Sequence, residues 1–189
     1  MDDAGIAPAR HKLTVGDYHR MAGAGILGED DRIELIHGDL IDMAPIGTDH
    51  ASVVNRMTEA FFLACAGRAV VSIQNPVRID EHSEPQPDVA ILRRRADFYA
   101  GGHPGPVDIL LLVEAADISL RFDRSVKLPL YARAGIAEYW IVDLAGRTLD
   151  AHRIPDGDGY RVKTTHRPGE ELALALAPGI MVRLDLVFG

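Results

Sequence analysis

Apolar and polar positions along the chain follow two periods, which predict a sheet combined with two principal helices. Apolar residues spaced three and four apart predict a helix over 49–66, which Thr48 or Asp49 can cap and Gly67 can end. The same spacing predicts a second helix over 123–134, closed by Gly135. Two continuous apolar runs, 86–92 and 109–119, are typical of strands buried on both faces.

Further strands are expected where apolar residues alternate between turn signals. They are expected at 70–79 with an interruption at Pro76, and at 138–143, 148–154, 160–164, 172–176 and 181–187. Strands mixed with two helices, without a repeat or a linker, predict one domain over residues 1–189. The expected fold class is α/β or α+β, with a mixed central sheet.

The first forty residues predict three smaller features. Residues 1–12 show no periodicity and are expected to form a loose arm. Thr14 can cap a short helix, with the Asp17 carboxylate near the positive helix end. The segments 32–36 and 39–43 flank the dipeptide His37-Gly38, which is typical of the turn in a β-hairpin.

The composition indicates a soluble globular protein. Hydrophobic residues make up 47% and charged residues 25% of the chain. No apolar run approaches the roughly 20 residues that span a bilayer, and the N-terminus lacks the pattern of a secretory signal. Cys65 is the only cysteine, which excludes an internal disulfide and a cysteine zinc cluster. A cytoplasmic protein without membrane contact is the expectation.

The charge balance limits the function classes without selecting one. A net charge of −8 argues against avid, non-specific binding to nucleic acid, although the basic strip 93–95 can still face phosphates. Only three lysines, Lys12, Lys127 and Lys163, stand against seventeen arginines. A lysine can shift its pKa where an arginine cannot, so each is of interest. Composition alone favours the simpler interpretation, a residue bias.

Two carboxylates in the apolar runs provide the candidate chemistry. Asp88 follows Pro87 at the start of one predicted strand, and Glu114 follows four apolar residues in the next. If these strands pair, both carboxylates lie at one end of the sheet and can share a divalent ion, for which Mg²⁺ is suited. Lys127 shares a predicted helix face with Asp123 and Tyr131, and it can support attack by water if that face points at Glu114.

Each of these residues also has a simpler interpretation. Asp88 after a proline is more often a turn residue than a ligand, and Lys127 can be a solvated residue paired with Asp123. Glu114 is harder to explain in this way, because a carboxylate that ends a buried strand needs a partner. Pro129 is expected to bend the second helix or loosen its first turn.

The motifs around these residues resemble the Uma-two-type family of predicted restriction endonucleases, within the PD-(D/E)XK nuclease superfamily. The resemblance covers roughly residues 13–185. It rests on the segments 34–45 (ELIHGDLIDMAP), 87–91 (PDVAI), 113–114 (VE) and 138–143 (EYWIVD), and on His50, Ser119, Asp123, Lys127, Tyr131-Ala132 and Ala134-Gly135-Ile136.

The resemblance implies a restriction-endonuclease-like core, a mixed central sheet flanked by helices, with a site for Mg²⁺ or Mn²⁺. It assigns Asp88 and Glu114 as metal ligands, together with the backbone carbonyl of Ala115. The superfamily's lysine is expected two residues after the glutamate, but Ala116 stands there, so the resemblance transfers that role to Lys127.

Two further residues and one departure follow from the same resemblance. Glu34 and His50 match family positions near the site and are second-rank candidates. Where the family often has serines after the glutamate, the chain has Asp117-Ile118-Ser119, so only Ser119 matches. This weakens a role for a polar run there but does not affect the acids.

Three functions remain open from the sequence. The first is a metal-dependent endonuclease that hydrolyses DNA phosphodiester bonds with Mg²⁺-activated water. The second is a non-catalytic module that binds nucleic acid or protein on a nuclease scaffold, which the acidic charge favours. The third is a structural oligomer such as a homodimer, because exposed strands near the C-terminus can pair between chains.

Overall fold

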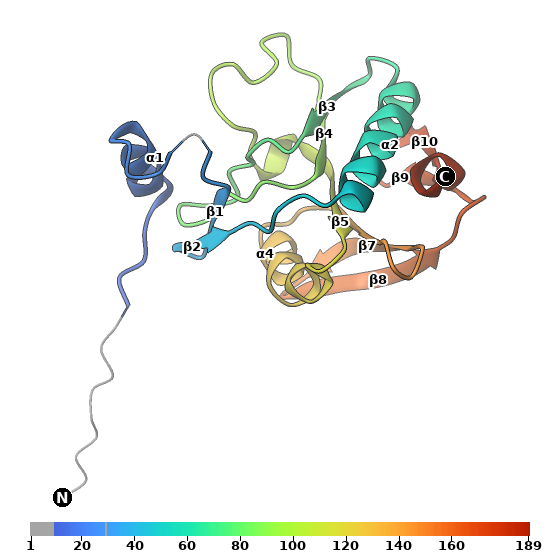
Figure 1. The fold of residues 1–189 in the computed structure, drawn as a ribbon. Helices are drawn as coiled ribbons and strands as arrows, with labels where there is room; N and C mark the ends of the chain where they lie inside the picture. Colours follow the sequence, from blue (N-terminus) through green and yellow to red (C-terminus); the bar gives the residue numbers. More distant parts are fainter. Residues whose placement is uncertain (1–9, 29) are drawn as a thin grey trace, which may run out of the picture.

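A six-stranded mixed sheet forms the centre of the molecule (Figure 1). The computed structural model describes residues 10–28 and 30–189, so most of the predicted arm over 1–12 lies outside the described residues. In spatial order, the strands are β3 (Ala69–Ile73), β4 (Val89–Arg93), β5 (Ile109–Ala116), β6 (Glu138–Asp143), β7 (Thr148–Asp156) and β8 (Gly159–His166). Only β5 and β6 pair in parallel; the other neighbours are antiparallel. The predicted mixed α+β architecture is therefore confirmed.

Helices cover both faces of this sheet (Figure 1). On one face, α2 (Thr48–Cys65), α5 (Leu184–Phe188) and the hairpin of β9 (Glu171–Leu174) and β10 (Ala177–Arg183) surround a core that includes Trp140. On the other face lies a helical segment formed by α3 (Leu120–Phe122), η2 (Asp123–Lys127) and α4 (Leu128–Arg133). A short 3₁₀ turn, η1 (Pro106–Asp108), precedes β5. No helix in the described part of the chain has the length and apolarity needed to cross a bilayer.

The predicted N-terminal helix and hairpin are both present. Helix α1 (Val15–Gly23) begins with a capping box, in which the side chains of Thr14 and Asp17 each accept a backbone N–H of the other residue. The hairpin consists of β1 (Ile33–Ile36) and β2 (Asp39–Asp42). Its turn places His37 at φ 51° and Gly38 at φ 75°, as a two-residue hairpin turn requires. Ile36 and Ile41 pack with the apolar cluster on the α4 face, so the hairpin covers part of that face.

The predicted bounds of α2 and β3 need correction. Gly47 stands at the N-cap of α2 without a side-chain cap, so the predicted capping by Thr48 or Asp49 is wrong. At the other end, Ala66 already adopts the left-handed conformation before Gly67. The strand expected over 70–79 ends at Ile73, because Gln74 has φ 50° and donates its N–H to the Asp88 carbonyl.

The C-terminal segment is also different from its prediction. The sequence predicts a strand over 181–187, but residues 184–188 form α5. Leu184, Val187 and Phe188 are spaced three and four residues apart and are buried in the same core cluster as α2. Contact with α2 therefore decides the structure of a segment that is too short for its own pattern to do so.

The second principal helix begins earlier than predicted and contains a wide turn. It starts at Leu120, and Leu128 donates its N–H to the Asp123 carbonyl, five residues earlier, which is the π-helical spacing. Pro129 explains this irregularity, because it lacks an N–H and its ring would crowd the Ser125 carbonyl in a regular α-helix. Gly135, at φ 74°, follows the helix as expected.

Candidate functional site

The pairing of β4 with β5 brings Asp88 and Glu114 together, as the sequence predicted. Val89 pairs with Val113, so Asp88, immediately before β4, lies across from Glu114. Side chains alternate between the faces of a strand, and both carboxylates share the face of Ala90 and Leu112, which α4 covers. Glu114 lies inside β5 rather than at its end, because the strand continues as a buried segment to Ala116.

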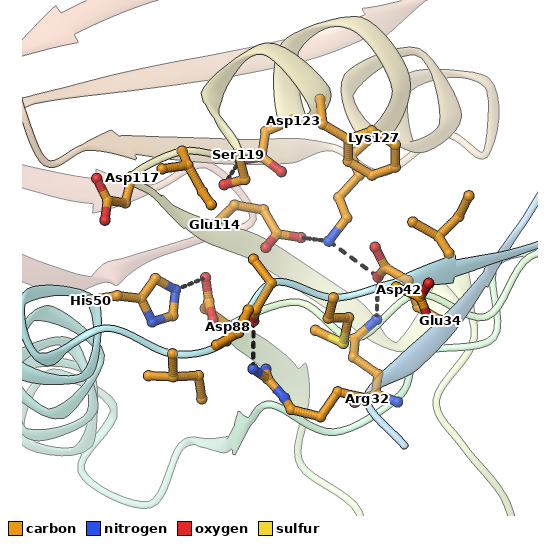
Figure 2. A pocket seen from close by; sticks show the side chains of 18 of the residues that line it. Arg32, Glu34, Asp42, His50, Asp88, Glu114, Asp117, Ser119, Asp123 and Lys127 are labelled. Atoms are coloured by element: carbon orange, nitrogen blue, oxygen red, sulfur yellow. Dashed lines mark hydrogen bonds and ion pairs between the residues drawn. The ribbon is translucent and has the colours of Figure 1, made fainter. Parts of the chain in front are cut away.

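Lys127 points from the helical segment to Glu114 (Figure 2). Its Nζ lies 3.0 Å from Glu114 Oε1 and 3.2 Å from Glu34 Oε2. The Tyr131 hydroxyl donates to the same Glu114 oxygen at 3.2 Å. Because Lys127 is only 4% exposed, its interpretation as a solvated surface residue is wrong.

Glu34 reaches this cluster from the N-terminal hairpin. It lies in β1, is 3% exposed, and accepts the Gln86 N–H at 3.1 Å as well as contacting Lys127. Gln86 precedes Asp88 by two residues in the extended segment before β4. The hairpin is therefore attached to the sheet directly beside the two carboxylates.

Asp88 is held by donors from three elements. His50 Nε2, in the first turn of α2, lies 3.1 Å from Oδ2, and the Ala115 N–H donates to the same oxygen at 2.9 Å. The Gln74 amide donates to Oδ1 at 3.1 Å. Burial opposes ionisation of Asp88, but these partners, His50 first, outweigh it and lower the pKa of the carboxyl. The Asp88 hydrogen bond in turn raises the pKa of His50.

Burial opposes the ionisation of two other acids in the cluster, Glu114 and Asp123. Burial raises the pKa of Glu114 well above its usual range, and Lys127 offsets this only in part. Burial also raises the pKa of Asp123 to about 6, although Ser119 donates a hydrogen bond to that carboxylate at 2.7 Å. Burial alone lowers the pKa of Lys127, but Glu114, Glu34 and Asp123 outweigh it and raise that pKa. The ammonium therefore stays charged among more carboxylates than it can neutralise.

These groups form the floor of a cleft of about 380 Å³ between the hairpin, the start of α2 and the helical segment. Its walls carry the apolar residues Ile41, Met43, Ile46, Ile118 and Phe122. The five side chains predicted from the sequence all line it, namely Glu34, His50, Asp88, Glu114 and Lys127, together with Asp42, Asp117 and Asp123. The structure thus brings together these five side chains in a space of the size typical for ligand sites, whereas Ala115 is not among the lining residues.

The arginine strip 93–95 lies elsewhere. Arg93 ends β4 whereas Asp88 precedes it, so the strip is separated from the carboxylates by the length of the strand, roughly 17 Å at 3.3 Å per residue. Arg95 is paired with Asp97, and Arg94 lies over the Phe98 ring. The strip is exposed, but it is not part of the cleft.

The sequence left some residues of the site unassigned. The spacing of Asp123 and Tyr131 predicts that they share a helix face with Lys127, but it does not indicate a role for either residue. Gln74 and Gln86 were missed, because their contacts with Asp88 and Glu34 depend on an irregular segment without periodicity.

Comparison with solved structures supports the fold. The crystal structure described as "a putative nuclease belonging to DUF820 from Anabaena variabilis ATCC 29413" superposes with a TM-score of 0.70. The two sequences are 12% identical, and the alignment covers 93% of this chain and 97% of the other. At this identity the similarity establishes the shared fold alone. A search of curated proteins gives no match.

Sequence comparison assigns the family. Residues 15–186 match the family Uma2, whose description is "Putative restriction endonuclease". This range includes all the elements from α1 to β10 that build the cleft and its supporting sheet. Because the match extends over nearly the whole chain, the protein belongs to the Uma2 family.

Proposed function

We propose that the protein is a metal-dependent endonuclease that hydrolyses DNA phosphodiester bonds by attack of water. The observation that carries this proposal is the pairing of Asp88 with Glu114 on adjacent strands, with the Lys127 ammonium 3.0 Å from Glu114, on the floor of an open cleft. The family description and the nuclease fold of the structural neighbour support the same class of reaction.

The residues of the cleft fit a hard divalent cation, Mg²⁺ or Mn²⁺. Carboxylate and carbonyl oxygens are the ligands that such ions prefer, and Asp88, Glu114 and the Ala115 carbonyl would supply them. Burial raises the pKa of Glu114, so a dication would relieve a charge that the protein alone does not balance. When bound, such an ion supplies a more acidic water and neutralises charge on the phosphate.

The surrounding side chains then have separable roles. His50 and Gln74 orient the Asp88 carboxylate through one oxygen each, which keeps that group ionised and fixed. Glu34 and Glu114 hold the Lys127 ammonium in its charged form. This ammonium is placed to position a water or to offset negative charge as the phosphate reacts. Tyr131 fixes the direction of the Glu114 side chain.

Cleavage of supercoiled plasmid tests the proposal. We expect the protein to nick the plasmid with Mg²⁺ or Mn²⁺, and the variants Asp88→Asn and Lys127→Met to lose this activity. Lys163→Met is the matched control and should cleave normally, because Lys163 is an exposed residue that pairs with the buried Asp150 outside the cleft. Nicking that survives both site substitutions would contradict the catalytic roles assigned to Asp88 and Lys127. Absence of nicking with either ion, in protein that still binds DNA, would favour a non-catalytic nucleic-acid module.

A further inference from the structure

A second group of potential metal ligands lies outside the cleft. The His19 and His103 imidazoles and the Glu84 carboxylate each place one ligand atom within 4.8 Å of the other two. His19 belongs to α1, Glu84 to the extended segment before β4, and His103 to the connection between β4 and β5. None of the three lines the cleft described above. Three distant segments of the chain therefore converge on one small volume.

Glu84 is the residue that points to a missing partner. It is 2% exposed, and its Oε1 lies 2.6 Å from His19 Nε2. Its second oxygen, Oε2, is buried and has no hydrogen-bond partner among the residues that the structure describes. Buried polar atoms are almost always satisfied, and a buried carboxylate that is satisfied on one oxygen only is costly. A cation bound at this carboxylate would supply the missing interaction.

We propose that His19, Glu84 and His103 bind a divalent transition metal ion, with Zn²⁺ as the best fit. Two imidazole nitrogens and one carboxylate oxygen, with the fourth position open to solvent, form an established zinc ligand set. Zinc bonds of about 2.0–2.2 Å require the three ligand atoms to approach more closely than 4.8 Å. Both imidazoles are exposed, so small side-chain rotations can bring them inward onto the fixed carboxylate.

The ligand type separates this site from the cleft. Imidazole nitrogen suits Zn²⁺ and other transition metals, whereas Mg²⁺ prefers oxygen. The carboxylates of the cleft would therefore select a different ion from the histidine site. An Fe²⁺ ion can use the same two-histidine, one-carboxylate set, so the metal titrations below compare both ions.

The proposed ion would join the parts of the molecule that position the cleft. The Glu84 N–H donates to the Leu35 carbonyl at 2.8 Å, beside Glu34 in β1. Two and four residues further along, Gln86 contacts Glu34, and Asp88 enters the cleft. The connection that carries His103 is attached nearby, because Arg78 donates its N–H to the Pro104 carbonyl at 2.9 Å. A metal at Glu84 would thus fix α1 and this connection to the segment that leads into the cleft.

Calorimetric titration with Zn²⁺ tests the site directly in the full chain. We expect one zinc site that is insensitive to excess Mg²⁺, with affinity reduced on the order of 100-fold or more in His19→Ala and His103→Ala. His166→Ala is the matched control: His166 forms a comparable pair with Glu170, at 2.8 Å, and belongs to no group of three ligands within residues 10–28 and 30–189. Parallel titration with Fe²⁺ under anaerobic conditions, expected to be weaker, decides between the two ions.

The Asp88→Asn variant assigns the zinc to one site or the other. Zinc binding that persists in Asp88→Asn but is lost in His103→Ala supports the proposal. Zinc binding that is lost in Asp88→Asn and kept in His103→Ala belongs to the cleft and overturns it, as does an absence of zinc binding by the parent protein. The result does not depend on plasmid cleavage, so the two proposals can fail separately.

Thermal unfolding provides a second measurement for variants that bind weakly. At zinc concentrations a hundredfold above Kd, the melting temperature should rise by roughly 5 °C over the chelated protein. His103→Ala changes an exposed residue in a connection, so it should fold like the parent and show no such rise. An equal rise in both proteins would contradict the proposed ligands.

Discussion

Two buried glutamates on adjacent strands of the central sheet are held in different ways. Glu138, at the start of β6, accepts hydrogen bonds from Trp140 Nε1 and Arg153 Nε at 2.7 Å on Oε1, and from the Ala175 N–H at 2.6 Å on Oε2. Glu114, in β5, accepts hydrogen bonds from the described residues on Oε1 only. The two side chains point to opposite faces of the sheet, since Glu138 lies on the same face as Trp140, in the α2 core, and Glu114 lies on the same face as Leu112, in the α4 cluster.

The difference separates a buried acid whose charge is compensated by its neighbours from one whose charge is not. Glu138 has a donor on each oxygen and an ion pair with Arg153, so its burial is compensated. Glu114 shares the Lys127 ammonium with Glu34 and lies near two further acids, and burial raises its pKa. An arrangement that leaves negative charge uncompensated is costly for folding alone and is typical of a site that binds a cation.

The substitution Glu114→Gln should have the largest effect, and that effect should be on activity. We expect plasmid cleavage to fall on the order of 10³-fold, because a metal contributes several kcal/mol to the transition state and the amide is a poor ligand. The free energy of unfolding should change by less than about 1 kcal/mol, since the Lys127 ammonium keeps its ion pair with Glu34 and the change removes a carboxylate whose ionisation burial opposes. Cleavage rates and urea unfolding of the same preparations measure both quantities. A Glu114→Gln variant that cleaves plasmid at the parent rate would contradict the functional difference between the two glutamates.

Glu138→Gln should show the reverse pattern. Removal of the charge leaves Arg153 without its carboxylate partner and weakens three hydrogen bonds, so we expect the free energy of unfolding to fall by about 3 kcal/mol. Cleavage per folded molecule should not change, because Glu138 does not line the cleft. Urea unfolding checks the first expectation, and activity corrected for the folded fraction checks the second. Loss of activity in folded Glu138→Gln would show that the two glutamates are not separate in function.

His50→Ala should have an intermediate effect on activity. His50 touches Asp88 rather than the proposed water, so its loss should lower cleavage by roughly 10- to 100-fold, or about 1.4–2.7 kcal/mol. His50→Gln should recover part of this activity, because an amide can donate to Asp88 at a similar position. A purely structural role would instead lower the stability of both variants without a difference between them in cleavage rate.

Asp123→Asn should have the smallest effect, visible as a change in pH dependence. The folded-state pKa of Asp123 is raised to about 6 by burial, so its contribution to stability is present below pH 3.8 and is lost as pH rises through about 6. Asparagine does not ionise, so the stability of Asp123→Asn does not fall for this reason. In chelator-treated protein, its stability relative to the parent should increase by roughly 1 kcal/mol between pH 5 and pH 7, measured by urea unfolding. A constant difference across this range would contradict the assignment.

The sequence predicted the centre of the site because its signals are local. The apolar runs around Asp88 and Glu114 identified two strands, and the spacing of Asp123, Lys127 and Tyr131 identified one helix face. The resemblance to a nuclease family added Glu34 and His50. Their distances to Lys127 and Asp88 result from how a hairpin and a helix pack on the sheet, which periodicity does not report.

What the sequence missed depends on contacts between distant segments. Alternating apolar residues suggested a strand over 184–187, but packing against α2 makes this segment helical. Gln74 ends β3 because it bonds to the Asp88 backbone and side chain, a contact across an irregular segment. The meeting of His19, Glu84 and His103 is of the same kind, since nothing in their spacing along the chain indicates that they are close.

Calorimetric titration with Mn²⁺ tests the central claim that the acids around Lys127 form a cation site. The titrated protein carries His103→Ala, so that the group of His19, Glu84 and His103 does not bind the added Mn²⁺. The account predicts that this protein binds Mn²⁺, that the additional change Glu138→Gln leaves the affinity unchanged, and that the additional change Glu114→Gln abolishes binding. Absence of binding, or equal binding after Glu114→Gln, would contradict it.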